Sequence, residues 1–495
     1  MCRMHPIPAG LYSAAQVREL DRCAIERHGI PGYELMTRAG HAALDTLRRA
    51  WPQARSVCVL CGPGNNGGDG YVLARVARAQ NLRTHVVALT DPQRLAGDAR
   101  HAYEDFAAAG GACEDWRPAL LQEVDVVVDA VFGTGLARTV EGRAADVFDC
   151  VNTTGRPVLA LDIPSGLHAD TGHALGTALR ADVTITFIGR KVGCYLGSGP
   201  DTVGRLVFDD LGVPPAVYDA LPVTRRLLAD STLDEALPRR LRTAHKGRHG
   251  HVLIVGGAAG MGGAARLAGE AALRVGAGLV TAAVHPQSLV ALSGRPELMT
   301  AAIADCAELE HALERASIVA VGPGLGQSPW STEVLAVVLG CGKPLVVDAD
   351  ALNLLALDPQ ARDGWVLTPH PGEAARLLGS STQDVQADRL GAAAELQARF
   401  GGTVVLKGAG SIVQGPHGES WICDRGNPGM AAAGMGDVLT GVIAGIAGQC
   451  GDLTLAARAG VFVHATAGDR AAQAGERGTT AGDVIDQLRA CVNPR

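Results

Sequence analysis

The sequence predicts an α/β protein with two domains, each built on a mostly parallel β-sheet that is covered by helices on both faces. Three observations lead to this prediction. Runs of valine, isoleucine and leucine alternate with helical patterns, the alternation stops and restarts near the middle of the chain, and glycine-rich turns follow several apolar runs. At 495 residues the chain is also too long for one ordinary hydrophobic core.

The first domain, which we place at 1–222, opens with an amphipathic helical pattern at 13–29. Five strand patterns then follow, at 56–60, 84–89, 124–133, 157–166 and 182–189. Helical patterns at 97–110 and 143–152 separate them, as crossover connections between parallel strands require. Ligands of such open sheets bind at the carboxyl ends of the strands.

A linker is expected at 223–246, where prolines and charges of both signs replace the alternating pattern. The alternation restarts in the second domain, at 247–495. Strand patterns open the segments 251–257, 279–285, 317–326, 343–353, 364–379 and 403–413. A helix rich in small residues is expected at 262–278, and two helical stretches close the chain.

Composition excludes several classes of partner. The formal net charge is −7, from 44 basic and 51 acidic residues, and no long basic cluster occurs, so we expect no nucleic-acid partner. The longest strongly apolar run, 438–448, is far shorter than the ~20 residues that span a bilayer, so we expect no membrane partner. The N-terminal region lacks the apolar core of a secretion signal, which favours a cytoplasmic location.

The twelve cysteines show no framework spacing, which suits a reducing compartment. Cys58 and Cys61 form a C-x-x-C pair inside a strand pattern with no second pair nearby, so we expect core cysteines rather than a zinc or redox site. Lysine occurs only at four positions: Lys191, Lys246, Lys343 and Lys407. A lysine retained in an arginine-rich chain suggests a position that needs a compact charge.

The segment 61–70, CGPGNNGGDG, lies where a strand turns into a helix. Its five glycines exceed the needs of a tight turn and favour a bound anion at the helix N-terminus. The fragment Gly62–Gly67 formally matches G-x-G-x-x-G, but it is more polar than a pyrophosphate turn requires. Asp129 and Asp162 end apolar strands, where a carboxylate needs a cation or hydrogen bonds. Capping of a following helix is the alternative role for Asp162.

The segment GMGDVLTG begins a long apolar helix in the second domain and contains Asp437. Backbone N–H groups at such a helix start can stabilise a transferring phosphoryl group, while the aspartate takes a proton from the attacking hydroxyl. Lys407 and the loop to Ser411 follow a strand and can wrap adenosine phosphates, although no Walker A motif occurs. His370 is either a structural residue between two prolines or a substrate contact.

With these segments identified, the chain resembles the bifunctional NAD(P)H-hydrate repair enzymes over nearly its whole length. The first domain is similar to the NAD(P)H-hydrate epimerase domain, a Rossmann-like three-layer fold, through LMTRAG, CGPGNNGGDGYVLAR, VDAVFGTGL and LDIPSGLHADTG. The second is similar to the ADP-dependent NAD(P)H-hydrate dehydratase, a ribokinase-like three-layer fold, through GHVLIVGG, GPGLG, DADALN, LTPHPGE, LKGAGS and GMGDVLTG.

The resemblance implies functional residues in both domains. In the first it implies Asp162 as the catalytic residue and potassium ligands at Asn66, Asp129 and Ser165. It implies contacts to the hydrated dinucleotide from Asn65, Asn66, Gly67, Gly68, Asp69, Gly133, Thr134, Gly135, Leu136, Ala137, Arg138 and Thr139. In the second it implies Asp437 as the catalytic base, substrate contacts from Ala264, Gly324 and His370, and nucleotide contacts from Lys407, Gly408, Ala409, Gly410, Ser411 and Gly436.

The implied activity is metabolite repair. The first domain interconverts the R and S hydrates of NADH and NADPH, and the second phosphorylates the S hydrate from ADP, so that phosphate leaves in place of hydroxide. The implied partners are the hydrated NADH and NADPH and ADP, with K⁺ and Mg²⁺ as cofactors and a homo-oligomer as the assembly. One departure from the family pattern is Met435, where a small residue is usual between two glycines.

Three other functions remain alternatives at this point. The chain could be a ribokinase-like small-molecule kinase with an auxiliary Rossmann domain, which would transfer phosphate to a stable alcohol. It could be an interaction module in RNA processing, although the acidic net charge, Asp129 and Asp162 argue against this. It could also be an NAD-dependent dehydrogenase that uses Gly62–Gly67.

Overall fold

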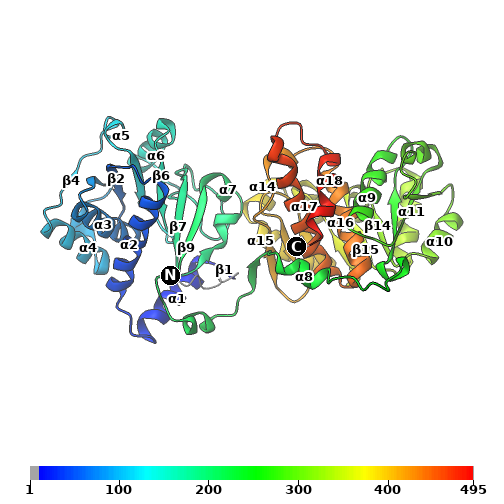
Figure 1. Cartoon of the computed structure of the whole chain (residues 1–495), viewed down its shortest axis with the longest axis horizontal. Helices are drawn as coiled ribbons and strands as arrows, with labels where there is room; N and C mark the ends of the chain where they lie inside the picture. Colours follow the sequence, from blue (N-terminus) through cyan, green and yellow to red (C-terminus); the bar gives the residue numbers. More distant parts are fainter. Residues whose placement is uncertain (1–9, 494–495) are drawn as a thin grey trace. The chain divides into compact units, whose positions relative to one another are not determined.

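The computed structural model describes residues 10–493, and the chain divides into two compact units, Met1–Thr224 and Arg225–Arg495 (Figure 1). Each unit has its own sheet and helices, which confirms the predicted α/β fold class. The segment 223–246, expected to be a linker, contains strand β10 (Arg225–Leu227) and helix α8 (Ser231–Ala236) of the second unit. No helix within residues 10–493 is long and apolar enough to cross a membrane.

The sheet of the first unit has seven parallel strands in the order β4-β3-β2-β5-β6-β7-β9. The strands are β2 (Ser56–Cys61), β3 (Arg83–Ala88), β4 (Cys113–Glu114), β5 (Val126–Ala130), β6 (Val158–Leu161), β7 (Val183–Phe187) and β9 (Arg205–Asp209). A separate short parallel pair joins β1 (Gly10–Tyr12) to β8 (Arg190–Lys191). The helices are α1 (Ala14–Glu26), α2 (Gly32–Ala50), α3 (Asn65–Ala79), α4 (Gly97–Ala108), α5 (Leu120–Glu123), α6 (Arg143–Thr154) and α7 (Gly199–Thr202).

Alternate residues of each strand face opposite sides of this sheet, because side chains in a strand alternate with period two. In β2, Val57 and Val59 pack in a core cluster with residues of α1 to α4, whereas Cys58 and Leu60 pack in a second cluster with residues of α5 and α6. The unit therefore has three layers, helices–sheet–helices. Cys58 and Cys61 are fully buried free thiols, as predicted for core cysteines.

The sheet of the second unit runs β13-β12-β11-β14-β15-β16-β17-β18-β19-β10. The strands from β13 to β17 are parallel, β18 is antiparallel to both its neighbours, and β10 is parallel to β19. Their bounds are β11 (His251–Gly256), β12 (Leu279–Val284), β13 (Met299–Ala302), β14 (Ile318–Val321), β15 (Leu345–Val347), β16 (Trp365–Leu367), β17 (Thr403–Leu406), β18 (Ile412–Gln414) and β19 (Ser420–Ile422).

Helices also cover the second sheet. They are α9 (Gly262–Arg274), α10 (Cys306–Glu314), α11 (Pro329–Gly340), α12 (Ala349–Leu357), α13 (Pro371–Leu378), α14 (Thr382–Ala387), α15 (Arg389–Phe400), α16 (Met435–Cys450), α17 (Leu453–Ala471) and α18 (Ala481–Cys491). Val252 and Ile254 of β11 pack in one core cluster with residues of α9, α16, α17 and α18. The intervening Leu253 and Val255 are fully buried on the other face. This packing makes α16 a central helix, and Figure 1 shows it between α17 and α9.

Candidate active sites

Asp129 lies in β5 of the first unit and is fully buried. Its Oδ2 accepts a hydrogen bond from the Ser165 N–H at 2.7 Å, and its Oδ1 accepts from the Ser165 hydroxyl at 2.5 Å and from the Val131 N–H at 3.2 Å. Burial raises the pKa of Asp129 to about 6, although these hydrogen bonds oppose the shift. A cation beside this carboxylate would stabilise its ionised form.

Asn66, in the first turn of α3, has a buried side chain with 7% exposure. Neither its Oδ1 nor its Nδ2 has a hydrogen-bond partner among the described residues. Burying an unpaired carboxamide is unfavourable, so these two atoms indicate a position that a ligand completes. Gly133 adjoins it, because a Cβ on Gly133 would lie 3.4 Å from Asn66 Cβ and 3.5 Å from Asp162 Oδ2.

Asp162 directly follows β6 and has a φ of +66°, in the left-handed region that aspartate adopts more readily than most residues. Its Oδ1 accepts a hydrogen bond from the ammonium of Lys191. Lys191 is fully buried and also donates to the Thr186 hydroxyl and the Phe187 carbonyl, both at 3.0 Å. In the described chain no helix starts between β6 and β7, so the capping role considered for Asp162 is wrong.

Two further carboxylates lie close enough to this pair to interact with it. Burial raises the pKa of Asp21, in α1, to about 6, with Lys191 opposing the shift and Asp162 adding to it. Burial also raises the pKa of Asp69 well above its usual value, and Asp162 and Asp21 add to this shift. Three carboxylates therefore share one buried lysine, and they compete for its charge.

The loop 133–139 contacts this cluster at its start. Leu136 is only 9% exposed and packs in the core beneath the sheet, so its backbone rather than its side chain is available to a ligand. Ala137, Arg138 and Thr139 are exposed, and Thr139 lies against Gly176. At the other side of the cluster, Asn65 is exposed at the start of α3.

Asp129 and Ser165 are joined by hydrogen bonds, and with Asn66 they offer a carboxylate, a hydroxyl and a carboxamide oxygen. Such oxygen donors suit a hard cation, and the unpaired Asn66 carboxamide is the observation that fits one. Within residues 10–493 no group of three or more histidine, cysteine, aspartate or glutamate side chains is placed to hold a metal ion. A cation in the first unit would therefore depend on the asparagine and serine oxygens.

Asp437 occupies the first turn of α16, which starts after Gly434. The Val438 N–H bonds to the Gly434 carbonyl at 3.0 Å, so the N–H groups of the preceding helical residues are free of intrahelical bonds. Burial raises the pKa of Asp437 to about 7; the Asp348 carboxylate adds to the shift and Lys407 opposes it. A carboxylate with this pKa accepts protons efficiently near neutral pH.

Asp348 is a buried carboxylate that accepts hydrogen bonds from two side chains of the second site. It is 1% exposed; its Oδ1 accepts from Lys407 Nζ at 2.6 Å, and its Oδ2 accepts from the Thr440 hydroxyl at 2.7 Å. Lys407 Nζ also lies 3.8 Å from Glu373 Oε2. Burial alone would lower the pKa of Lys407, but the two carboxylates raise it overall. A Cβ on Gly436 would lie 3.3 Å from Lys407 Nζ, so the missing side chain keeps this ammonium accessible.

The loop 407–411 is supported by a buried arginine. Arg389 is 2% exposed, and its Nη2 donates to the carbonyls of Leu406 and Lys407 at 3.3 and 3.2 Å. Gly408 has a φ of +135°, and a Cβ there would lie 3.0 Å from the guanidinium, so only glycine suits this turn. Ser411 closes the loop by donating to the Gly408 carbonyl at 2.8 Å.

The predicted substrate residues of the second unit are Ala264, Gly324 and His370. A Cβ on Gly324, whose φ is +60°, would lie 3.1 Å from the Ala264 Cβ, so these two residues adjoin. His370 caps α13 through Nδ1, which accepts from the Gly372 N–H at 2.9 Å, and Glu373 accepts from the His370 N–H. His370 thus has a structural role, while its side chain remains 54% exposed for contact with a ligand.

Met435, the departure from the family pattern, is 6% exposed and packs in the core cluster of the second unit. Its side chain therefore contributes to the core of this unit. Sequence reasoning did not single out five polar residues of the two sites: Asp21, Asp348, Glu373, Arg389 and His464. His464 is buried beside Lys407, and burial and this positive charge lower its pKa to about 4. Only Asp348 and Glu373 had a signal, because they belong to the segments DADALN and TPHPGE.

Known protein families match both units. Residues 32–193 match the family described as YjeF-related protein N-terminus, and residues 252–490 match the family described as NAD(P)H-hydrate dehydratase. The chain is 46% identical over 486 residues to the bifunctional NAD(P)H-hydrate repair enzyme Nnr of Coxiella burnetii, which covers 98% of this chain and 99% of the relative. Its identity to the Escherichia coli enzyme of the same description is 43% over 490 residues, covering 99% and 95%.

A solved structure supports the fold of the second unit. A ribokinase-like superfamily protein from Enterococcus faecalis superposes with a TM-score of 0.51 at 28% identity, covering 55% of this chain and 96% of that one. The predicted ribokinase-like fold is thereby confirmed.

Proposed function

The chain belongs to the family of bifunctional NAD(P)H-hydrate repair enzymes, and on this premise we propose that its two units carry the two repair activities. The first unit interconverts the R and S hydrates of NADH and NADPH. The second unit converts the S hydrate to NAD(P)H, consuming ADP and releasing AMP and phosphate. The alternative of a ribokinase-like kinase acting on a stable alcohol fits the family less well.

In the first unit, inversion of the hydroxyl-bearing carbon requires one bond at that carbon to break and to re-form on the opposite face. A group that removes the hydroxyl proton would let the bond to the ring nitrogen open to an aldehyde, and return of the proton would accompany its closure on the other face. Asp162 would do this, with Lys191 holding its carboxylate in place. Asn66, Asp129 and Ser165 would hold K⁺. When bound, K⁺ would supply positive charge to a site that otherwise contains several buried carboxylates. The unpaired Asn66 side chain supports this assignment.

In the second unit, Asp437 would accept the hydroxyl proton of the S hydrate as that oxygen attacks the β-phosphorus of ADP. The bond between the bridging oxygen and the β-phosphorus breaks, AMP leaves, and the hydrate carries a phosphate ester. Loss of phosphate and of a ring proton then restores the double bond. The free N–H groups of α16 and Lys407 would hold the migrating phosphoryl group. Mg²⁺, when bound with ADP, would neutralise phosphate charge.

One observation carries this proposal: Asp437, with its pKa near 7, stands at a helix N-terminus beside Lys407. The test uses separated hydrates. The R hydrate without ADP should yield the S hydrate faster than it does without protein, and the S hydrate should yield NADH only when ADP is added. A stable phosphorylated product from the S hydrate would instead indicate a kinase. A homo-oligomeric assembly and a cytoplasmic location remain predictions.

A further inference from the structure

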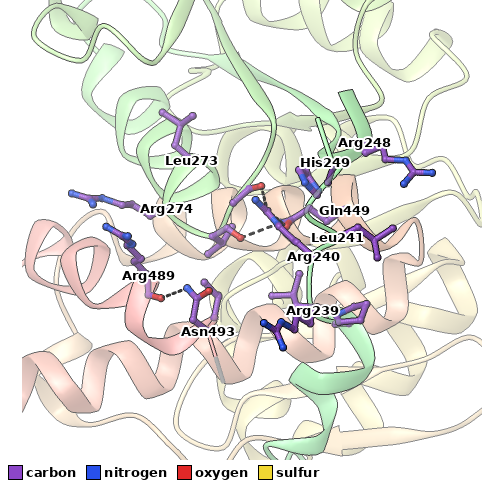
Figure 2. Close-up of a pocket in the computed structure, with 17 residues that line it drawn as sticks. Arg239, Arg240, Leu241, Arg248, His249, Leu273, Arg274, Gln449, Arg489 and Asn493 are labelled. Carbon is purple, nitrogen blue, oxygen red and sulfur yellow. Dashed lines mark hydrogen bonds between the residues drawn. The ribbon is translucent and has the colours of Figure 1, made fainter. Parts of the chain in front are cut away.

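A cavity of about 1190 Å³ lies in the second unit, away from Asp437 (Figure 2). Its lining comes from the segment before β11, the turn before β12, and the carboxyl ends of α16 and α18. These are the amino-terminal ends of the strands, whereas the first turn of α16, which contains Asp437, lies at the opposite edge of the sheet. The cavity therefore belongs to neither nucleotide site described above.

The lining of this cavity is strongly positive. It contains five arginines and no carboxylate: Arg239, Arg240, Arg248, Arg274 and Arg489. Within residues 10–493, only Arg274 among them forms an ion pair, a long contact of 3.6 Å to the exposed Asp486. Burial lowers the pKa of His249, and Arg240, His245 and Arg248 lower it further, as expected where positive charge is not balanced.

Arg240 is held in place at the centre of the cavity. Its Nη2 donates to the carbonyl of Gly276 and to Oε1 of Gln449, as the dashed lines in Figure 2 show. A Cβ on Gly276, whose φ is +101°, would lie only 2.4 Å from this Nη2, so the contact requires glycine. These two bonds occupy one nitrogen and leave the rest of the guanidinium fork for a ligand.

The lining also contains apolar side chains: Leu237, Leu241, Leu273, Val275 and Val492. Leu273 and Leu241 lie on opposite sides of Arg240 (Figure 2), and Leu241 is 63% exposed. A ligand that fills the cavity would therefore contact both arginine and apolar side chains.

We propose that this cavity binds a small molecule that carries a linear diphosphate or triphosphate group. Arginine forks bind phosphate oxygens in pairs, and several arginines without carboxylate partners suit a multiply charged anion. The cavity exceeds the ~300–1,000 Å³ of typical ligand sites, so it admits a nucleotide as readily as a free polyphosphate. In a nucleotide, the base would contact apolar side chains of the lining, such as the exposed Leu241.

The test locates binding by hydrogen–deuterium exchange of the full chain, titrated separately with inorganic tripolyphosphate and with ATP. The proposal expects peptides 237–250 and 486–493 to be protected with the same half-maximal ligand concentration. Any protection of peptides 407–411 and 434–437, at the Asp437 site, is measured separately. Protection by ATP at a lower concentration than tripolyphosphate would identify a nucleotide ligand. Equal midpoints would identify recognition of the phosphates alone.

Two variants each lose three positive charges, one inside the cavity and one outside it. Replacing Arg239, Arg240 and Arg489 by glutamine should raise the tripolyphosphate midpoint about tenfold or more. Replacing Arg242, Arg315 and Arg399, exposed arginines outside the cavity, should leave it unchanged. Equal losses in both variants, or no protection of the cavity peptides in the wild-type chain, would overturn the proposal. Protection that requires self-association of the chain, seen by light scattering, would assign the cavity to a second copy instead.

Dehydration and epimerisation assays are independent of this result. A chain without repair activity can still be tested for tripolyphosphate binding, and a chain that binds no tripolyphosphate can still be tested for repair activity. This separates the new site from the proposed function.

Discussion

Lys191 and Asp162 form a buried ion pair in which every proton of the ammonium has an acceptor. The lysine side chain is fully buried, and the aspartate side chain is 16% exposed. The remaining two protons go to the Thr186 hydroxyl and the Phe187 carbonyl. The pair therefore fixes the position of one Asp162 oxygen and leaves the other, Oδ2, beside Gly133.

Removal of this lysine should destabilise the first unit. Lys191→Met leaves a buried carboxylate unpaired, and such losses cost about 3–5 kcal/mol. We expect a fall of this size in the free energy of unfolding, measured by urea titration, together with loss of epimerisation. Under conditions where the variant remains folded, the rate of S-hydrate dehydration should be unchanged, because it depends on Asp437 in the second unit. An unchanged unfolding midpoint would show that the pair contributes little.

Asp162→Asn isolates the charge of the proposed catalytic carboxylate. Asparagine tolerates the left-handed backbone at this position, whereas alanine would add strain. We expect epimerisation of the R hydrate to fall to the spontaneous rate while the S hydrate is still dehydrated, as followed by chromatographic separation of the two hydrates. Consumption of the R hydrate at the wild-type rate would exclude Asp162 as the catalytic residue.

Asp437→Asn should have the opposite effect. Loss of a general base costs about 10²- to 10⁴-fold in rate, so ADP-dependent formation of NADH should fall by that factor. Interconversion of the hydrates should continue, because Asp437 belongs to a different unit with its own sheet. Loss of both activities in a folded variant would contradict two independent sites.

The pH dependence of dehydration follows from the pKa of Asp437. This pKa is raised to about 7, and the base must be deprotonated to act, so kcat/KM should fall as pH decreases below about 7. Asp348→Asn gives a second profile. It removes a negative charge that raises the pKa of Asp437, so the midpoint should move to lower pH. A flat profile between pH 5 and pH 8 would argue against Asp437 as the base.

Potassium should stabilise the first unit through the buried oxygens of Asn66, Asp129 and Ser165. At constant ionic strength, replacing choline by K⁺ should raise the Tm of the wild-type chain. Asp129→Asn should abolish the difference, because it removes the only charged donor of the set. An equal shift in this variant would place the K⁺ effect elsewhere in the chain.

The sequence predicted the fold well where a strand is buried on both faces. All five strand patterns of the first domain are strands, because parallel strands of this kind are near-continuous apolar runs. The edge strands β4 and β9 were not predicted, since an edge strand has a weaker pattern. In the second unit, β10 lies inside the expected linker, because three partly buried residues pair with β19 only once the sheet exists.

The site residues divide in the same way. Asp162 ends an apolar strand and Asp437 begins an apolar helix, both in glycine-containing segments, so the local sequence singled them out. Asp21 and His464 lie on ordinary helices, and only packing brings them close to Lys191 and Lys407. Such long-range juxtaposition leaves no local signal in the sequence.

The most direct test of the central claim is recovery of NADH absorbance from a mixture of R and S NADH hydrates, incubated with the purified chain, ADP and magnesium. The account predicts full recovery that requires ADP, because the first unit supplies the S form as the second consumes it. Recovery that stops at the S fraction would contradict the epimerase role of Asp162 and its loop, and no recovery would contradict the repair function as a whole.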